Sequence, residues 1–182
     1  MKKYKVLSII ICLTLLVVAF CSCSAEQKFD SAVSKMTKRL SSAKTVTQTV
    51  TVTDGDTIVY QYVKRAEFNG SEANVTIEKN ELSSDFTLKK TEESLTADKA
   101  SQLSLPINLQ SSNVDFFVLA NDSISCIAGR DKAAALLGAD NYAAAGDVNV
   151  NCVLQKGSLI TLDCNYTTSS QRNVTVSVSC EY

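Results

Sequence analysis

The side chains of this 182-residue chain with the greatest chemical potential are its seven cysteines. Three lie within the first 23 residues, and the other four are Cys126, Cys152, Cys164 and Cys180. In an exported chain such cysteines can form disulfides, and four cysteines allow three pairings. We expect the pair Cys164–Cys180 first, because their strands are expected to be neighbours. The alternative is four buried thiols that pack as small apolar groups. No two of the four stand as close as the Cys-x-x-Cys pairs of zinc sites, so we expect no metal.

Catalytic patterns are scarce in the sequence. Histidine is absent, which excludes histidine-based triads and general bases. The segment Ser41-Ser42-Ala43-Lys44 matches Ser-x-x-Lys, but neither Lys-Thr-Gly nor Ser-Asp-Asn accompanies it, so a solvated helix end is the better interpretation. Eighteen basic against nineteen acidic residues give a net charge of −1 and no broad basic surface for nucleic acid. We therefore expect a protein that is not an enzyme, needs no cofactor and binds no nucleic acid.

Three tyrosines are candidates for a binding cavity. Tyr60, Tyr62 and Tyr166 each combine a large apolar ring with a polar hydroxyl, as ligand-binding cavities require. In segments that alternate as strands do, all three occupy the same alternate positions as the apolar residues, so they are expected to face the interior. The alternative is that they are ordinary core or rim residues.

The N-terminal segment has the pattern of a targeting signal. Lys2, Lys3 and Lys5 precede an apolar run, Val6 to Phe20, and a segment of small residues follows, Cys21 to Ala25. The run is shorter than the ~20 residues that a membrane-spanning helix needs, but it suits the apolar region of a signal peptide.

This segment resembles a bacterial lipoprotein signal, in which a small residue precedes a cysteine that receives a diacylglyceryl group. Ser22 before Cys23 fits that pattern, and Cys21 is the alternative modified residue. The resemblance implies that residues 1–22 are removed and that the chain is lipid-anchored on the extracytoplasmic face of the cell membrane. Two alternatives stay open: a secretory signal cleaved near Ala25, and an uncleaved membrane anchor.

The rest of the chain predicts one helix followed by strands. Phe29, Val33, Met36 and Leu40 form an apolar stripe within a helix expected over residues 25–44. From Thr45 the apolar residues alternate, and Asp54-Gly55-Asp56 predicts a hairpin turn. Strands are expected over 45–53, 58–68, from Val75, around Phe86 and Leu88, and over 114–119, 123–128, 148–154, 160–166 and 174–182.

The middle of the chain contains a second helix and an irregular segment. Residues 103–109 alternate but contain Pro106, which predicts an edge strand or a covering loop. Residues 130–137 predict a short helix that Gly138 ends. The sequence therefore divides into a signal peptide (1–22), a lipidated tether (23–27) and one α+β domain (28–182).

The order of these elements is similar to the LolA/LppX type of lipoprotein carrier. The similar features are the turn Asp54-Gly55-Asp56, the segment from Ala133 to Gly138 and the terminal strand to Tyr182. The resemblance implies a curved antiparallel half-barrel packed against an N-terminal helix and a short second helix, with a hydrophobic or lipid ligand between sheet and helices. The predicted function is thus a non-enzymatic, lipid-anchored extracytoplasmic protein that binds such a ligand. The alternative is a surface interaction, scaffold or sensing module with a protein partner, because a filled and a hollow half-barrel share one apolar pattern.

Overall fold

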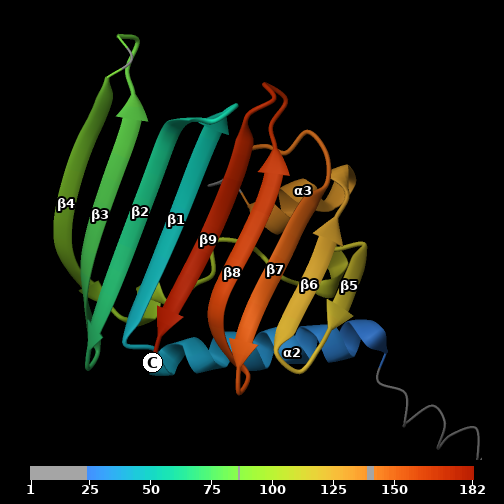
Figure 1. Ribbon diagram of the computed structural model, residues 1–182. Coiled ribbons are helices and arrows are strands. Elements are labelled where there is room, and N and C mark those ends of the chain that lie inside the picture. Colours follow the sequence, from blue (N-terminus) through green and yellow to red (C-terminus); the bar gives the residue numbers. More distant parts are fainter. Residues whose placement is uncertain (1–23, 86, 139–141) are drawn as a thin grey trace, which may run out of the picture.

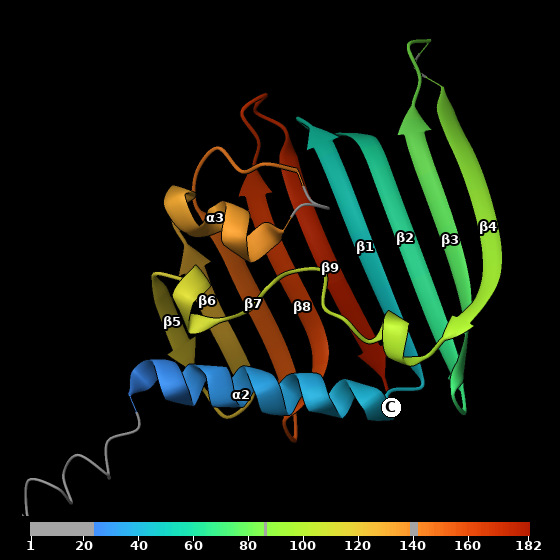
Figure 2. The same cartoon turned by 180° about the vertical axis from the view of Figure 1, so that it is seen from behind.

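The strands form one open, curved antiparallel sheet with helices against one face (Figures 1 and 2). A computed structural model describes residues 24–85, 87–138 and 142–182, and within these the sheet has nine strands. In chain order the elements are α2 (Ala25–Arg39), η1 (Leu40–Ser42), β1 (Thr45–Asp54), β2 (Thr57–Asn69), β3 (Glu72–Leu82), β4 (Leu88–Asp98), η2 (Ala100–Gln102), η3 (Ser111–Asn113), β5 (Phe116–Leu119), β6 (Ser123–Ala128), α3 (Arg130–Leu137), β7 (Val148–Gln155), β8 (Ser158–Thr167) and β9 (Asn173–Glu181).

The path of the chain brings its first and last strands together in the middle of the sheet. The strand order is β4-β3-β2-β1-β9-β8-β7-β6-β5. The chain meanders from β1 out to the β4 edge, and residues 99–115 then cross to the β5 edge, from which a second meander returns to β9. β9 pairs with β1 from Thr45↔Glu181 to Thr53↔Asn173. The crossing segment (residues 99–115) therefore lies over the same face as the helices (Figure 2). We call this the inner face and the opposite one the outer face.

Helix α2 begins at a well-formed cap. The Ser24 hydroxyl accepts a hydrogen bond from the Gln27 backbone N–H (3.2 Å), and the Gln27 side chain accepts one from the Ser24 N–H (3.1 Å). This reciprocal capping box satisfies two amides that otherwise lack partners at a helix start. The helix begins at Ala25, as expected, so residues 25–27 of the segment expected as the tether lie within it. The helix ends at Arg39, earlier than the expected Lys44, and a 3₁₀ turn leads into β1.

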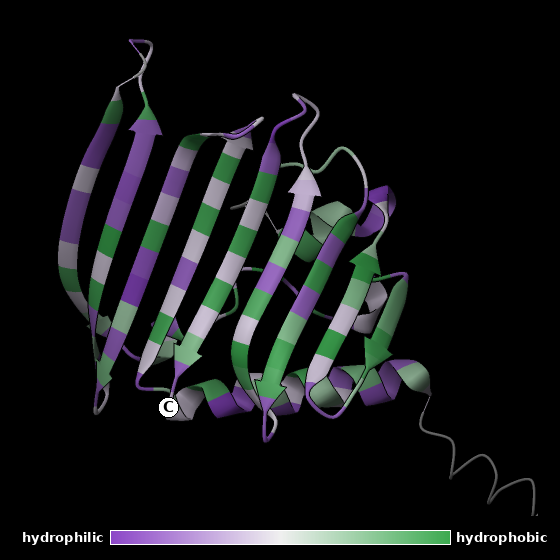
Figure 3. Cartoon of the chain, in the orientation of Figure 1, coloured by the Kyte–Doolittle hydropathy of each residue, from purple (hydrophilic) through white to green (hydrophobic). Residues whose placement is uncertain are grey.

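The core lies between α2, α3 and the inner face of β5 to β9. The predicted stripe of α2 is buried, and the Phe29 ring packs against Phe117 of β5 with ring centroids 4.7 Å apart and ring planes tilted by 41°. Alternation within each strand sends apolar side chains inward and Thr, Ser and Asn outward, which Figure 3 shows as alternating bands of colour. Ala133, Leu136 and Leu137 bring α3 onto this core.

Most of the predicted elements are confirmed, and the corrections concern the middle of the chain. The turn Asp54-Gly55-Asp56 joins β1 and β2, and α3 has the predicted bounds. Residues 103–109 belong to no strand. Of the two predicted alternatives, an edge strand and a covering loop, the covering loop is observed, because Pro106 and its neighbours lie over the inner face instead of pairing at an edge. Of the residues expected in the fourth strand, Leu88 begins β4, whereas Phe86 lies outside the described residues. The class α+β is broadly fitting, although strands dominate.

Candidate functional site

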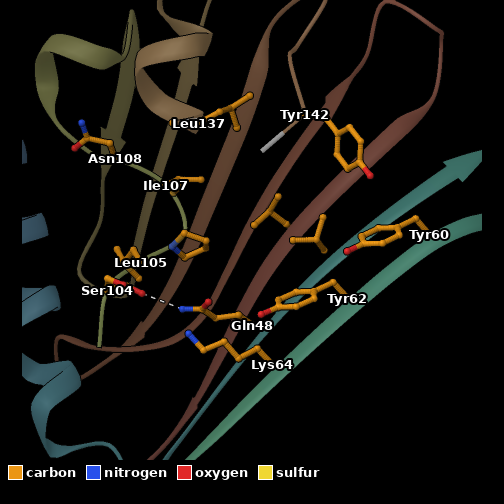
Figure 4. Close-up of a pocket in the computed structure, with 14 residues that line it drawn as sticks. Gln48, Tyr60, Tyr62, Lys64, Ser104, Leu105, Ile107, Asn108, Leu137 and Tyr142 are labelled. Carbon is orange, nitrogen blue, oxygen red and sulfur yellow. Dashed lines mark hydrogen bonds between the residues drawn. The ribbon is translucent and has the colours of Figure 1, made fainter. Parts of the chain in front are cut away.

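A pocket of about 820 Å³ opens on the inner face, where β1 and β2 emerge from under the helices. It lies between these strands and the crossing segment (Figure 4). Its lining residues are Gln48, Val50, Tyr60, Tyr62, Lys64, Ser104, Leu105, Pro106, Ile107, Asn108, Leu137, Gly138, Tyr142 and Val176. Volumes of this size are typical of sites for small molecules.

The sheet wall of the pocket is set by strand register. Tyr60, Tyr62 and Lys64 alternate along β2 and so share the inner face. Tyr62 lies opposite Val50 of β1, and Lys64 lies opposite Gln48. Figure 4 shows the three β2 side chains projecting toward the space that the crossing segment borders from the other side.

The opposite wall is tied to the sheet and to α3. The Gln48 side-chain amide donates a hydrogen bond to the Ser104 carbonyl (2.9 Å), and the Asn108 N–H donates one to the Leu136 carbonyl (2.7 Å). Between these two anchors, Leu105 and Ile107 present apolar side chains to the pocket. The pocket is therefore a preformed gap between two fixed walls.

The polar groups of the pocket are partly withdrawn from water. The pKa of the Tyr62 phenol is raised, mainly by burial and further by the charge of Glu93. The pKa of Tyr60 is also raised, mainly by burial and further by the neighbouring Tyr142, Tyr62 and Glu81. Burial lowers the pKa of the Lys64 amine. Within residues 24–85, 87–138 and 142–182, no carboxylate forms an ion pair with Lys64. Lys64 is thus a partly buried cation that could pair with an anionic group of a ligand.

The arrangement can hold a molecule with two kinds of surface. Val50, Leu105 and Ile107 offer apolar contact, while the phenols and Lys64 offer hydrogen-bond donors. Tyr142 faces Tyr60 edge-on, with ring centroids 6.3 Å apart, and closes one side. In the part of the chain that the structure describes, no group of three metal-binding side chains comes together.

The third predicted tyrosine lies elsewhere. Tyr166 is 5% exposed, lies opposite Val174 on β9 and does not line this pocket. Burial raises the pKa of its phenol, and the Tyr142 backbone opposes part of that shift. The structure therefore does not bring Tyr166 together with Tyr60 and Tyr62; Tyr166 lines a different cavity, of about 380 Å³, where β8 and β9 meet the segment before β7.

The four cysteines of the domain are free thiols and are all buried. Cys164 of β8 lies opposite Val176 of β9. Cys180 is four residues beyond Val176 on β9 and lies opposite Val46 of β1. At about 3.3 Å per residue this offset is roughly 13 Å, beyond the ~7 Å that a disulfide spans between Cα atoms. The expected Cys164–Cys180 bridge is therefore wrong.

The other two cysteines lie beside Cys164. Cys126 and Cys164 both flank Val150 on β7, and Cys152 is the next inward residue of that strand. Burial raises the pKa of Cys152 and Cys164 to about 12, and that of Cys126 to about 11. These thiols are protonated at neutral pH and contribute packing, which is the alternative stated above.

The residues expected to carry the lipid, Cys23 and Cys21, lie outside the described residues, as does the signal peptide before them. Of the helices that the structure describes, none combines the length and the apolar character needed to cross a membrane.

Sequence reasoning missed several residues of the pocket. Lys64 is two residues after Tyr62, and Gln48 is two residues before Val50, so both side chains point to the same inner face. Alternation alone could therefore have found them. Leu105, Ile107 and Tyr142 carry no such signal, because their positions depend on how the chain crosses the sheet. The charge of Lys64 within an otherwise apolar alternation was the available clue.

No protein-family model matches this chain, and no curated protein does. Among solved structures it is similar to a redesigned β-barrel, mFAP1, bound to DFHBI, with 12% sequence identity and a TM-score of 0.25 over 80% of this chain and 98% of that chain. A likeness at this level carries no argument about ligand or function.

Proposed function

We propose that this protein is a lipid-anchored extracytoplasmic binding protein whose pocket holds an amphipathic, lipid-like ligand. The observation that carries the proposal is the preformed 820 Å³ pocket, with apolar side chains on one wall and two tyrosines and a lysine on the other. An apolar chain fits against Leu105 and Ile107, and an anionic head group fits against Lys64. No residue is assigned a catalytic role.

The anchoring part of the proposal is supported by the sequence before the domain. Lys2, Lys3 and Lys5, the apolar run 6–20 and Ser22-Cys23 together resemble a lipoprotein signal. Stable attachment takes two acyl chains, because each buried methylene contributes only ~0.8 kcal/mol. A diacylglyceryl group on Cys23 supplies both.

Native mass spectrometry of the full chain extracted from its own host membranes tests the ligand. We expect an added, releasable mass of lipid size. A chain that carries no such mass, even after incubation with lipid extract, would favour the alternative of an interaction or sensing module with a protein partner.

The pocket itself is tested with a dansylated fatty acid as the probe. Lys64→Met and Tyr62→Ala are each expected to weaken binding about tenfold, which corresponds to ~1.4 kcal/mol. Lys89→Met is the matched control, because Lys89 lies on β4 and outside the pocket lining. Equal affinities for Lys64→Met and Lys89→Met would show that the anionic group is bound elsewhere.

The anchor is tested by a pair of matched substitutions. Cys23→Ala is expected to release the protein from the membrane fraction, and Cys21→Ala is expected to leave it there. The reverse pattern would identify Cys21 as the modified residue. Retention of both variants would point to an uncleaved anchor.

A further inference from the structure

An apolar patch lies on the outer face at the β5 edge of the sheet. Phe116 is 73% exposed, Val118 is 68% exposed and Ile127, directly opposite Phe116 on β6, is 38% exposed. A shallow groove of about 280 Å³ runs beside them, and its other wall consists of the uncharged Asn149 and Asn151 among others. We call Phe116, Val118 and Ile127 the edge patch.

The other edge of the sheet differs in chemistry. β4 carries Lys89, Lys90, Glu92 and Glu93, and charges of this kind discourage an edge strand from associating with other molecules. β5 reads Phe-Phe-Val-Leu and carries no charged side chain. Asp115, the residue before β5, forms an ion pair with Lys132 at 3.1 Å. The edge patch is therefore both exposed and free of net charge, as a surface that meets an apolar partner must be.

The partner is indicated by where the chain enters the domain. Phe117, which lies between Phe116 and Val118 and points to the opposite face, packs against Phe29 of α2. The next residue of α2, Asp30, accepts hydrogen bonds from the Ser111 N–H and hydroxyl at 2.7 Å each. The start of α2 is thus fastened to the β5 edge, as Figure 1 shows.

The residue proposed to carry the membrane anchor directly precedes this part of the chain in the sequence. Ser24, the cap of α2, precedes Phe29 by five residues, which is about 7–8 Å along a helix. Cys23 is the residue immediately before Ser24. A bilayer that holds Cys23 therefore lies within reach of β5, whereas β4 is at the far end of the sheet (Figure 1).

We propose that the edge patch is a membrane-contact surface, which inserts Phe116 and Val118 into the interfacial region of the bilayer that anchors the chain. This inference rests on the membrane-anchoring part of the proposed function. Tethering at Cys23 raises the local concentration of the patch at the membrane, so a few apolar side chains are sufficient for contact. The contact holds the β5 edge at the membrane and directs the charged β4 edge away from it.

The absence of tryptophan from the chain permits a direct test. Phe116→Trp places a single fluorophore in the edge patch, and Leu88→Trp places one at the β4 edge, where Leu88 is 55% exposed. The membrane-extracted full chain is reconstituted into vesicles of phosphatidylcholine and phosphatidylglycerol with brominated acyl chains. We expect the Phe116→Trp emission to shift to the blue and to be quenched at least about twofold more than that of Leu88→Trp, since only interfacial side chains reach the bromines.

Flotation of the vesicles separates the failure of this inference from the failure of the anchor. If the chains float with the vesicles but Phe116→Trp and Leu88→Trp are quenched equally, the membrane contact is overturned while the anchor is supported. Chains that do not float overturn the anchor, and the contact with it. If the emission of Phe116→Trp shifts to the blue as the protein concentration rises in the absence of vesicles, the patch contacts a second copy of the chain, and the membrane contact is overturned. Val118→Trp provides an independent reporter if Phe116→Trp fails to fold.

Discussion

The two ends of the sheet use the same alternating strand pattern for different purposes. In the packed half, β5 to β9, the inward residues are apolar and lie under α2 and α3; β9, for example, contributes Val174, Val176 and Val178. In the open half, β2 to β4, the inward positions include Lys89, Thr91 and Glu93 of β4, which are exposed. Alternation therefore determines which face a side chain occupies, and the residue type at the inward position determines whether that face can be covered.

The candidate pocket lies at the boundary between the halves. Val50 and Val176 continue the apolar core, while Tyr62 and Lys64 introduce the polar character of the open half. A sheet covered throughout would leave no room there, and a bare sheet would have no opposite wall. The contrast between the halves is thus what generates a site with two kinds of surface, and it can be tested by perturbing each half separately.

The largest expected effect is on the core of the packed half. Phe29→Ala removes a fully buried ring that packs against Phe117. We expect the free energy of unfolding to fall by about 3–5 kcal/mol, because the lost burial and the remaining cavity add together. Urea denaturation measures this loss. Leu88→Ala in the open half is the control, and we expect a change below ~0.5 kcal/mol. Similar losses for both variants would show that the two halves do not differ in packing.

Alkaline pH is expected to destabilise the packed half in particular, because it holds all four buried thiols. Unfolded thiols lose their protons near pH 9.0, whereas folding raises the pKa to about 11 for Cys180 and about 12 for Cys152. Between pH 9 and about 11 the folded chain binds more protons than the unfolded one, so the free energy of unfolding falls as pH rises. The slope is up to ~1.4 kcal/mol per pH unit for each thiol, and below pH 9 the thiols contribute no slope.

Urea denaturation at a series of pH values checks this sign. Cys152→Val removes one titrating thiol while keeping an apolar side chain, so its stability is expected to decline less steeply above pH 9 than that of the parent chain. An identical decline in both would indicate that other groups cause the alkaline loss. Peptide mapping after alkylation adds a second check, since Cys152 is expected to react only in denaturant.

Most elements could be predicted because their signals are local. Helix α3 follows from a short run of helix formers before Gly138, and the β1–β2 hairpin follows from alternation around Gly55. The crossing segment is different: Leu105 and Ile107 alternate as a strand does, yet they pack over the inner face because no strand edge lies beside them.

The candidate site was predictable only in part for a related reason. Strand alternation places Tyr60 and Tyr62 on one face of the sheet, and it assigns Tyr166 the same inward direction. Whether an inward side chain meets a helix or a pocket depends on strand order, and the order follows from the pairing of β1 with β9. That pairing joins residues more than a hundred positions apart, and nothing in either strand alone specifies it.

A smaller effect is expected at the cap of α2. Ser24→Ala removes the hydroxyl that accepts the Gln27 N–H and disrupts the capping box, which should cost about 1 kcal/mol. Because α2 covers only the packed half, hydrogen exchange is expected to accelerate in the first turn of α2 and to stay unchanged in β3 and β4. Ser24→Asp retains an acceptor at the cap and should keep parental exchange. Acceleration across β4 would mean that the open half depends on α2 after all.

The smallest expected effect compares one turn from each half. Gly70 (φ +64°) and Gly157 (φ +78°) both have left-handed backbones, so alanine at either costs about 1–2 kcal/mol. A Cβ at Gly70 meets no atom within 4 Å, whereas one at Gly157 lies 3.0 Å from the Arg39 guanidinium at the end of α2. Arg39 is exposed, so its guanidinium can move aside at the cost of some lost contact, and Gly157→Ala should cost only a few tenths of a kcal/mol more than Gly70→Ala. Repeating both in an Arg39→Ala background removes that contact, and the two costs should then converge; a persistent difference would place its origin in the turns themselves.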